Sequence, residues 1–255
     1  MTIKNPFDLT GKVALVTGST MGIGEGTARV LAEQGAEVII SSRKQEQCDE
    51  VAEAFREQGL KAEGKACHIG RMEDIDAMYR HIRDRYGRLD ILVNNAVLSP
   101  WRTIEDTDVG LFDKTVEVSL RGYWFMSTEA AKLMKTHGGG SIINIASVAA
   151  LHPDRMLSLY STLKTALIGM SRSFALEYGR DNIRANTILP GVFPTKLADA
   201  FDDEARRKIL DKTALGRLGK VEEIGYAVTY LCSDAGAYVT GNNLVVDGGM
   251  TVGLM

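Results

Sequence analysis

Short runs of apolar, mostly β-branched residues recur along the chain, and segments with helical periodicity separate them. Most runs are apolar throughout rather than alternating, which is typical of strands buried on both faces of a parallel sheet. The helical segments provide the crossovers that parallel strands require. The pattern predicts a doubly wound α/β fold with a single, mostly parallel sheet of about seven strands. The predicted strands are residues 13–17, 36–41, 62–68, 91–96, 141–147, 183–189 and 243–246.

Length and composition narrow the possible classes of protein. The 255 residues contain no repeat, low-complexity tract or linker, so we expect one domain over residues 1–255. No run of about 18 consecutive apolar residues exists, and the first residues lack the apolar core of a secretory signal, so we expect no membrane span and no export. The net charge of −3 offers no basic field for nucleic acid. Three cysteines without zinc-type spacing predict reduced thiols, a cytoplasmic location and no metal site.

A glycine-rich loop joins the first predicted strand to the first predicted helix. Gly18 allows a sharp turn, while Gly22 and Gly24 allow the backbone to approach a phosphate and the helix to pack on the sheet. Free N–H groups and the positive end of the helix dipole then face an anion. A turn that is glycine-rich for geometry alone is the alternative, but the position in the chain favours dinucleotide binding by a Rossmann fold. The predicted contacts are Gly18, Ser19, Met21, Gly22, Ile23 and Gly24.

The end of the second predicted strand bears on which dinucleotide binds. NAD enzymes usually place an acid there, which holds the adenosine ribose hydroxyls. This chain has Ser42, Arg43 and Lys44 instead. A guanidinium can bind the 2′-phosphate that a carboxylate would repel. The same charges could simply begin a solvated helix, so NADP(H) is favoured and NAD(H) stays possible.

Tyr160 and Lys164 are four residues apart in a segment with helical periodicity, so they would share one face of a helix. A phenol titrates near pH ~10 in water. An ammonium about 4 Å away, at an effective dielectric constant near 20, favours the phenolate by roughly 4 kcal/mol. That is enough to lower the pKa of the phenol by about 2–3 units. The spacing predicts a proton-transferring tyrosine; the alternative is a pair of amphipathic side chains that snorkel from an ordinary helix.

Further motifs stand at fixed distances from this pair. Ser147 ends the fifth predicted strand, upstream of Tyr160. With the glycine loop, the chain also carries Asn94-Asn95-Ala96, Pro190-Gly191 and Asp247-Gly248-Gly249. In these motifs the chain resembles the short-chain dehydrogenase/reductase superfamily over roughly residues 9–250. Residues 41–45 and 67–70 are similar to NADPH-dependent carbonyl and retinol reductases of that superfamily.

The resemblance implies an NAD(P)-dependent oxidoreductase that interconverts a ketone or aldehyde and an alcohol by hydride transfer. Tyr160 would be the general acid for reduction and the base for oxidation. Ser147 would hydrogen-bond the reacting oxygen, and Lys164 would also bind the ribose hydroxyls of the nicotinamide half. Besides Tyr160 and Lys164, the implied cofactor contacts are His68, Ile69, Asn95, Ala96, Pro190, Gly191, Val192 and Thr195.

Three positions depart from the family pattern, and one of them is His68, which stands where the family has an acid that contacts adenine. Val97 stands where the family has a glycine, and a β-branched residue would be strained there if the backbone needs a positive φ. Ser119 stands where the family has an asparagine that holds a water in a proton relay from the lysine. A serine hydroxyl donates and accepts hydrogen bonds but is shorter. Ser119 is therefore a further candidate catalytic residue, which either preserves the relay through an added water or fills space.

Substrate contacts in this fold come from loops beyond the strand ends. Residues 97–101, 149–157 and 193–201 are mostly apolar, which predicts a medium-sized apolar ketone or secondary alcohol as the small-molecule substrate. A 3-oxoacyl-acyl-carrier-protein reductase of fatty-acid synthesis and a cofactor-binding regulator with impaired turnover are the alternatives.

The predicted helix over residues 111–134 has apolar residues on more than one face, which indicates a largely buried helix. In the family this helix and the tyrosine helix form contacts between subunits, and the tail over residues 250–255 often joins a second interface. The resemblance therefore implies a homotetramer, with a dimer as the alternative.

Overall fold

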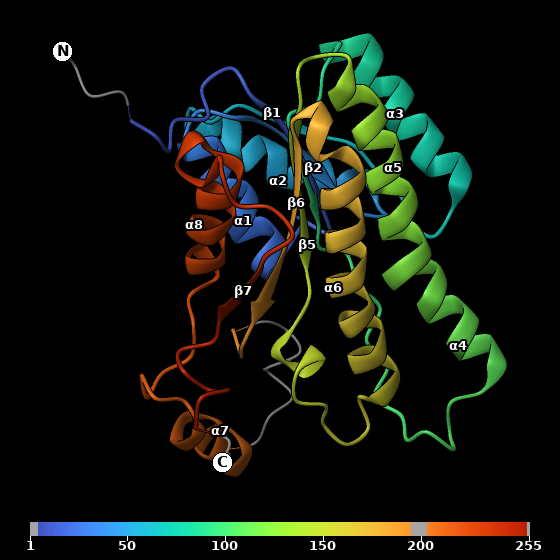
Figure 1. The fold of residues 1–255 in the computed structure, drawn as a ribbon, viewed down its shortest axis with the longest axis vertical. Helices are drawn as coiled ribbons and strands as arrows, with labels where there is room; N and C mark the ends of the chain where they lie inside the picture. Colours follow the sequence, from blue (N-terminus) through green and yellow to red (C-terminus); the bar gives the residue numbers. More distant parts are fainter. Residues whose placement is uncertain (1–4, 195–202, 254–255) are drawn as a thin grey trace.

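The computed structural model describes residues 5–194 and 203–253, with one seven-stranded sheet at its centre (Figure 1). Every pair of neighbouring strands is parallel, in the order β3-β2-β1-β4-β5-β6-β7. The order reverses between β1 and β4, the position where doubly wound sheets bind ligands. The predicted fold is confirmed. The strands are β1 (Val13–Thr17), β2 (Glu37–Ser41), β3 (Ala62–Gly64), β4 (Ile91–Asn94), β5 (Gly140–Ile145), β6 (Ile183–Pro190) and β7 (Asn243–Val246).

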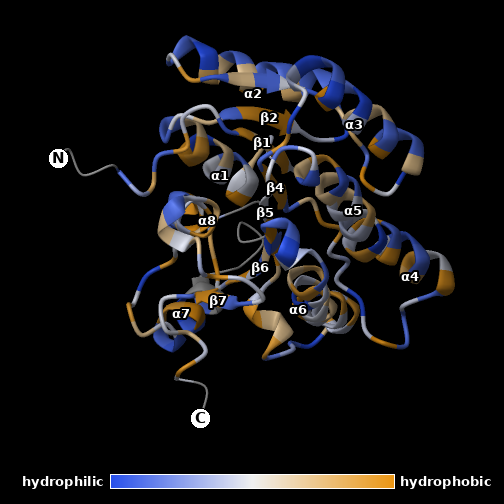
Figure 2. Ribbon diagram, turned by 45° about the horizontal axis from the view of Figure 1, so that its top comes forward, coloured by the Kyte–Doolittle hydropathy of each residue, from blue (hydrophilic) through white to orange (hydrophobic). Residues whose placement is uncertain are grey.

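Helices cover both faces of the sheet, and each face has its own hydrophobic core (Figure 2). On one face lie α1 (Gly22–Glu33), α2 (Gln45–Glu57) and α8 (Val221–Cys232). On the other lie α3 (Met72–Tyr86), α5 (Gly122–Lys135) and α6 (Ser158–Tyr178). Two further helices are α4 (Val109–Val116) and α7 (Asp203–Lys212). Within the described ranges, no helix has both the length and the apolar composition needed to cross a membrane.

The local sequence accounts for how these elements form. All five residues of β1 are buried, as expected for a central strand. Helix α3 buries Ile75, Met78, Tyr79 and Ile82, which recur at the spacing of one helical face, and its other side is charged. Gly87 ends α3 in the left-handed conformation, where its N–H bonds the last free carbonyls of the helix.

Two predicted elements differ from the structure by more than two residues at an end or in their division. The third strand ends at Gly64 rather than at residue 68, although Lys65 N–H and Cys67 N–H still donate to Ile40 C=O at 2.9 Å and Ser42 C=O at 2.8 Å. The helix predicted over residues 111–134 is divided into α4, a π-helical turn (Glu117–Arg121) and α5. The division lets Gly122 abut the neighbouring loop, where a Cβ would lie 2.4 Å from Ile69 O.

The same helical region is also less buried than predicted. Phe112 is 48% exposed, Trp124 46% and Phe125 38%. Its buried side chains lie mainly in α5, whereas α4 buries Thr115 among its residues. The apolar residues on the second face therefore lie on the surface of the single chain, because an apolar periodicity does not show which side chains the rest of the chain will cover.

Candidate active site

The loop between β1 and α1 is folded tightly against the end of β4. Gly18 has φ +66° and Gly22 φ +58°, a region that residues with a Cβ rarely adopt. A Cβ on Gly18 would lie 2.8 Å from Ala96 Cα, and one on Gly24 would lie 2.2 Å from Gly18 O. The predicted reasons for glycine, a sharp turn and close packing, agree with this geometry.

The residues after β4 hold the glycine loop in place. The Asn95 side-chain amide donates to the carbonyls of Thr17 at 3.0 Å and Gly18 at 3.1 Å. The backbone N–H groups of Asn95 and Ala96 donate to the Thr17 hydroxyl at 2.9 and 3.1 Å. Asn95 and Ala96 are thus brought to the loop, as the resemblance implies, and the amide of Asn95 is already engaged there.

The start of α1 is suited to an anion. Met21, the residue before the helix, makes no side-chain capping hydrogen bond and is 45% exposed. The first N–H groups of a helix have no partner inside the helix, and the helix dipole is positive at this end. Gly22, Ile23 and Gly24 therefore form a cradle whose chemistry and shape fit the pyrophosphate of a dinucleotide.

Ser19 is fully buried within the glycine loop. Its hydroxyl donates to Val16 C=O at 2.6 Å and accepts from Ser41 N–H at 2.8 Å. Its own N–H donates to Ser41 C=O. Because these groups are already paired, Ser19 anchors the loop to β2, and its contact with a cofactor stays a prediction.

The end of β2 and the segment after β3 lie together at one side of the glycine loop. Ser42 is half-buried, and Arg43 and Lys44 are exposed beyond it. The ring of His68 turns back on its own segment, where Nδ1 accepts from Gly70 N–H at 3.1 Å. Ile69 is buried beside it.

At the other side of the site, β6 and β7 position the chain after Pro190. Gly191 N–H donates to Val246 C=O at 3.0 Å, and a Cβ on Gly191 would lie 2.8 Å from Asp247 Cα. Val192 C=O accepts from Gly219 N–H at 3.2 Å. Thr195 lies outside the described residues.

Ser147, Tyr160 and Lys164 meet at the carboxyl end of β5. Ser147 caps a short turn of 3₁₀ helix, and its hydroxyl accepts from Ala149 N–H at 3.1 Å. The Ser147 side chain also hydrogen-bonds Tyr160. Lys164, one turn further along α6, has its Nζ 5.6 Å from the centre of the Tyr160 ring and donates to Ile145 C=O at 2.6 Å.

Lys164 does not snorkel. It is 2% exposed, and burial lowers its pKa to about 7. A lysine with a purely structural role would place its ammonium in water, because burial of a charge is costly. The alternative of an ordinary amphipathic pair therefore does not describe this helix.

The pKa of Tyr160 moves in the direction opposite to the prediction. Burial raises it, and the hydrogen bond from Ser147 opposes this rise only in part. The predicted lowering assumed an ammonium about 4 Å away and fully charged. In the structure the pKa of Lys164 is lowered to about 7, which leaves the charge of the ammonium incomplete at neutral pH.

The departures from the family pattern at Ser119 and Val97 are accommodated. The Ser119 hydroxyl donates to Leu98 C=O and accepts from Leu98 N–H, both at 3.3 Å, so it contacts the loop after β4 rather than Lys164. Among the described non-glycine residues, a positive φ occurs at Met156 and Asn182. Val97 is therefore not strained.

A buried polar network beneath the site is absent from the predictions. Asn94 donates to Ser127 and to Asn144, each at 2.9 Å, and Asn144 donates to Ser171 at 2.9 Å. Thr187 donates to the same serine at 2.7 Å. The network joins β4, β5 and β6 to α5 and α6. Its signal in the sequence is an asparagine within each of two otherwise apolar strands.

Comparison with known proteins agrees with this geometry. A family profile described as Enoyl-(Acyl carrier protein) reductase matches residues 18–251. The dehydrogenase/reductase SDR family member 4 of Oryctolagus cuniculus is 39% identical over 244 residues, which cover 94% of this chain and 94% of that protein.

Solved structures are similar over nearly the whole chain. A gluconate 5-dehydrogenase from Burkholderia cenocepacia, in complex with NADP and tartrate, is 32% identical with a TM-score of 0.93 and covers 97% of this chain and 98% of its own. A 7α-hydroxysteroid dehydrogenase complexed with NADH and 7-oxo glycochenodeoxycholic acid is 31% identical with a TM-score of 0.93 and covers 98% of each chain.

Proposed function

The chain belongs to the short-chain dehydrogenase/reductase superfamily, and from that premise we propose that it interconverts a ketone or aldehyde and an alcohol by using NADP(H). The observation that carries the proposal is the contact of Ser147 with Tyr160 beside the buried ammonium of Lys164. These groups lie at the carboxyl edge of the sheet that also bears the glycine cradle. An acid, a hydroxyl donor and a cation in one place suit the reduction of a carbonyl.

The cofactor would lie across the carboxyl end of the sheet. The N–H groups of Gly22, Ile23 and Gly24 would hold its pyrophosphate, and Ala96 would line the ribose on the adenine side. Lys164 would bind the ribose on the nicotinamide side, and Gly191 and Val192 would border the nicotinamide. When bound, the nicotinamide supplies or accepts the hydride.

Tyr160 acts as the proton donor in this proposal. Because burial raises its pKa, the phenol is protonated at neutral pH and can give its proton to the oxygen of a reduced carbonyl. Ser147 orients that oxygen with a second hydrogen bond. Oxidation of an alcohol needs the phenolate, which positive charge from Lys164 and an oxidised nicotinamide would favour. The electrostatics of the chain itself therefore support reduction near neutral pH.

The preference for NADP(H) rests on Arg43 and Lys44. Both are exposed just beyond β2, at the position where an acid would instead hold unmodified ribose hydroxyls. A guanidinium there can form charge-assisted hydrogen bonds with a 2′-phosphate. Of the two similar structures described above, one contains NADP and the other NADH. They do not distinguish the two cofactors, so the proposed preference is based on Arg43 and Lys44 alone.

The surroundings of the site support an apolar substrate. Val97 is 44% exposed, Trp101 39% and Met156 44%, so apolar surface is available beyond the strand ends. Arg102 N–H donates to Met156 C=O at 2.9 Å and joins the two loops that carry this surface. We therefore assign the protein a medium-sized apolar ketone or secondary alcohol. Because Ser119 and Val97 leave the site intact, turnover is favoured over a purely regulatory role.

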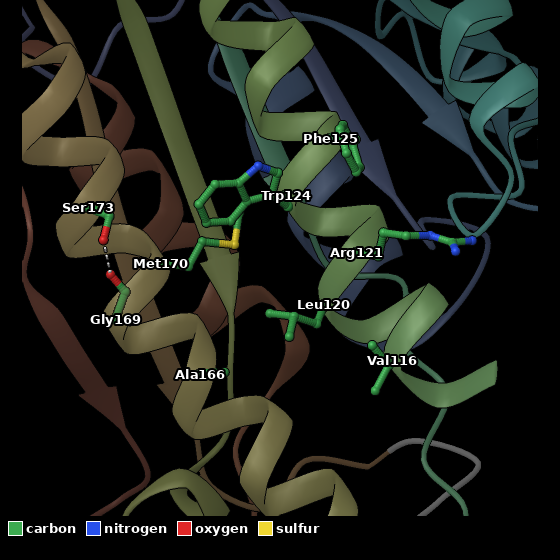
Figure 3. Close-up of a pocket in the computed structure, with 9 residues that line it drawn as sticks. All are labelled: Val116, Leu120, Arg121, Trp124, Phe125, Ala166, Gly169, Met170 and Ser173. Carbon is green, nitrogen blue, oxygen red and sulfur yellow. Dashed lines mark hydrogen bonds between the residues drawn. The ribbon is translucent and has the colours of Figure 1, made fainter. Parts of the chain in front are cut away.

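A homotetramer is part of the proposal. The outer faces of α5 and α6 line a cavity of about 410 Å³ (Figure 3). Trp124 and Met170 are among its apolar lining residues, and Trp124 is 46% exposed. A second copy of the chain would cover this surface. The three free thiols, Cys48, Cys67 and Cys232, support a cytoplasmic location for the assembly.

The test is a titration with NADPH and NADH followed by a panel of aliphatic, cyclic and aromatic ketones, aldehydes and acetoacetyl thioesters. The proposal expects NADPH to bind more tightly than NADH and to be oxidised by apolar ketones. Turnover confined to acetoacetyl thioesters would favour the acyl-carrier-protein reductase. Binding of NADPH without turnover of any carbonyl would favour the regulator and would contradict the proposal.

A further inference from the structure

A second aromatic ring contacts the ammonium of Lys164. Tyr123 of α5 is fully buried, and its ring centre lies 5.5 Å from Lys164 Nζ. The ring of Tyr160, on α6, lies at 5.6 Å from the same atom. Both distances fall within the roughly 6 Å over which a cation is attracted to an aromatic face. The ammonium is therefore in contact with two rings from two helices.

The hydroxyl of Tyr123 does not explain why a tyrosine is buried here. Among the described residues it has no hydrogen-bond partner. Burial raises its pKa, with a further contribution from Tyr160, so the phenol is neutral. Another fully buried tyrosine of the same core, Tyr79, donates its hydroxyl to Met126 C=O at 2.5 Å. Buried tyrosines usually have such a partner. The ring of Tyr123, rather than its hydroxyl, therefore makes the polar contact of this side chain, with the ammonium of Lys164.

Few other groups contact the ammonium of Lys164. One N–H of the ammonium donates to Ile145 C=O of β5. The titratable groups that face it are the phenols of Tyr160 from α6 and Tyr123 from α5. Ser119, from the π-helical turn before α5, is engaged with Leu98. A cation in such a setting gains most from polarisable aromatic faces, because water is excluded.

We propose that Tyr123 is a positioning residue of the active site, whose ring face stabilises and orients the Lys164 ammonium. This inference rests on the proposed function, because it assigns the ammonium a role next to Tyr160. In the family pattern an asparagine at the position of Ser119 supports the lysine. Here the side chain from this helical region that contacts Lys164 is Tyr123.

The test is a nuclear magnetic resonance titration of Lys164 Nζ in protein with isotope-labelled lysine, since it does not depend on turnover. Lys164→Arg identifies the resonance. Tyr123→Phe keeps the ring and should keep the pKa of Lys164. Replacement of Tyr123 by trifluorophenylalanine, which withdraws charge from the ring face at nearly constant size, should lower that pKa by about one unit. Tyr123→Met, which removes the ring, should lower it at least as much.

A control variant and a kinetic measurement distinguish a role of Tyr123 in positioning Lys164 from a role in packing the core. Tyr79→Met changes another buried tyrosine of the same core and should reduce thermal stability without moving the pKa of Lys164. In steady-state assays, the pH at which kcat falls on the alkaline side should move down in the fluorinated variant and stay in place in Tyr123→Phe.

Two results would overturn the inference. One is a Lys164 pKa that ring fluorination does not change. The other is a pKa that falls as far in Tyr123→Phe as in the fluorinated protein, since this would assign the effect to the hydroxyl. If the unmodified protein reduces no carbonyl, the proposed function fails, while the titration still decides whether the ring stabilises the ammonium.

Discussion

Lys164 is the residue whose environment most limits what the site can do. Its ammonium titrates at about 7 in the folded chain instead of the ordinary 10.5. Between these pH values the unfolded chain binds more protons than the folded chain, so stability increases as the pH rises across this window. Below about pH 7 both states are protonated, and the folded chain carries the full cost of a buried charge.

Lys164→Met should therefore stabilise the chain while it abolishes catalysis. An apolar side chain of similar length removes the buried charge, and we expect roughly 1–4 kcal/mol of added stability at about pH 6. The gain should shrink at about pH 9, where the wild-type lysine is largely neutral. Denaturant unfolding at the two pH values measures this, with Lys61→Met on the surface as the control. An equal gain at both pH values would contradict the assigned pKa.

Ser119 holds the loop after β4 through two hydrogen bonds with Leu98. Ser119→Ala removes both, and a net loss of about 0.5–1.5 kcal/mol per bond, or about 1–3 kcal/mol for the two, corresponds to a roughly 5- to 150-fold rise in KM for the carbonyl. We expect a smaller change in kcat, because the hydroxyl does not contact Lys164.

Steady-state kinetics with Ser119→Ala, Ser119→Thr and the distant control Thr136→Ala test this role. Ser119→Thr keeps a hydroxyl and should restore the wild-type KM. A loss confined to kcat in Ser119→Ala would instead support a direct part in the proton relay.

Secondary structure followed from the sequence wherever an element is central or strongly amphipathic. The predicted bounds of β1 and β7 match the structure. The predicted end of β3 was wrong because the sequence after Gly64 has no apolar run that would mark where the regular ladder with β2 ends. The π-helical turn could not be predicted, since the close approach of Gly122 to Ile69 beside it joins segments that are distant in sequence.

The members of the site were predictable because Ser147 follows a predicted strand and Tyr160 and Lys164 are one helical turn apart, but their electrostatics were not. The burial of Lys164 and Tyr160 sets the direction of both pKa shifts, and it depends on packing by distant elements. Tyr123 escaped prediction for the same reason. Its contact with Lys164 joins two helices that are adjacent in space rather than in sequence.

The turn between β2 and α2 is the element that should set cofactor preference. Arg43→Ala removes a charge-assisted contact worth about 1.5–3 kcal/mol, so the KM for NADPH should rise roughly 10- to 100-fold while that for NADH changes little. Arg80→Ala, on the exposed side of α3, is the control for the change in net charge. Equal effects on both cofactors would remove the basis for an NADP(H) preference.

At the scale of the whole molecule, the site lies where the strand order reverses, and helices from both faces surround it. On one face of the molecule, α5 and α6 expose apolar side chains that no other part of the described chain covers (Figure 3). The helix that carries Tyr160 and Lys164 thus also lines the proposed interface between subunits. Assembly and catalysis would share a structural element.

Trp124→Glu should break the proposed tetramer. A carboxylate in the middle of an apolar contact loses its hydration without a partner, so the assembly should dissociate to a dimer or monomer. Light scattering of the protein as it elutes from a size-exclusion column measures the mass of the assembly. Ile104→Glu, in an exposed loop, is the control. An unchanged mass in Trp124→Glu would place the interface elsewhere.

The most direct test of the central claim is the fate of the transferred hydrogen. Wild-type protein and Tyr160→Phe are mixed with cofactor deuterated at the reactive position of the nicotinamide and a ketone identified by the panel, and the alcohol is analysed by mass spectrometry. We predict deuterium on the carbinol carbon in the wild-type product and a rate reduced about 10²- to 10⁴-fold in Tyr160→Phe, with cofactor affinity retained. Full turnover by Tyr160→Phe, or an alcohol without deuterium, would contradict the account.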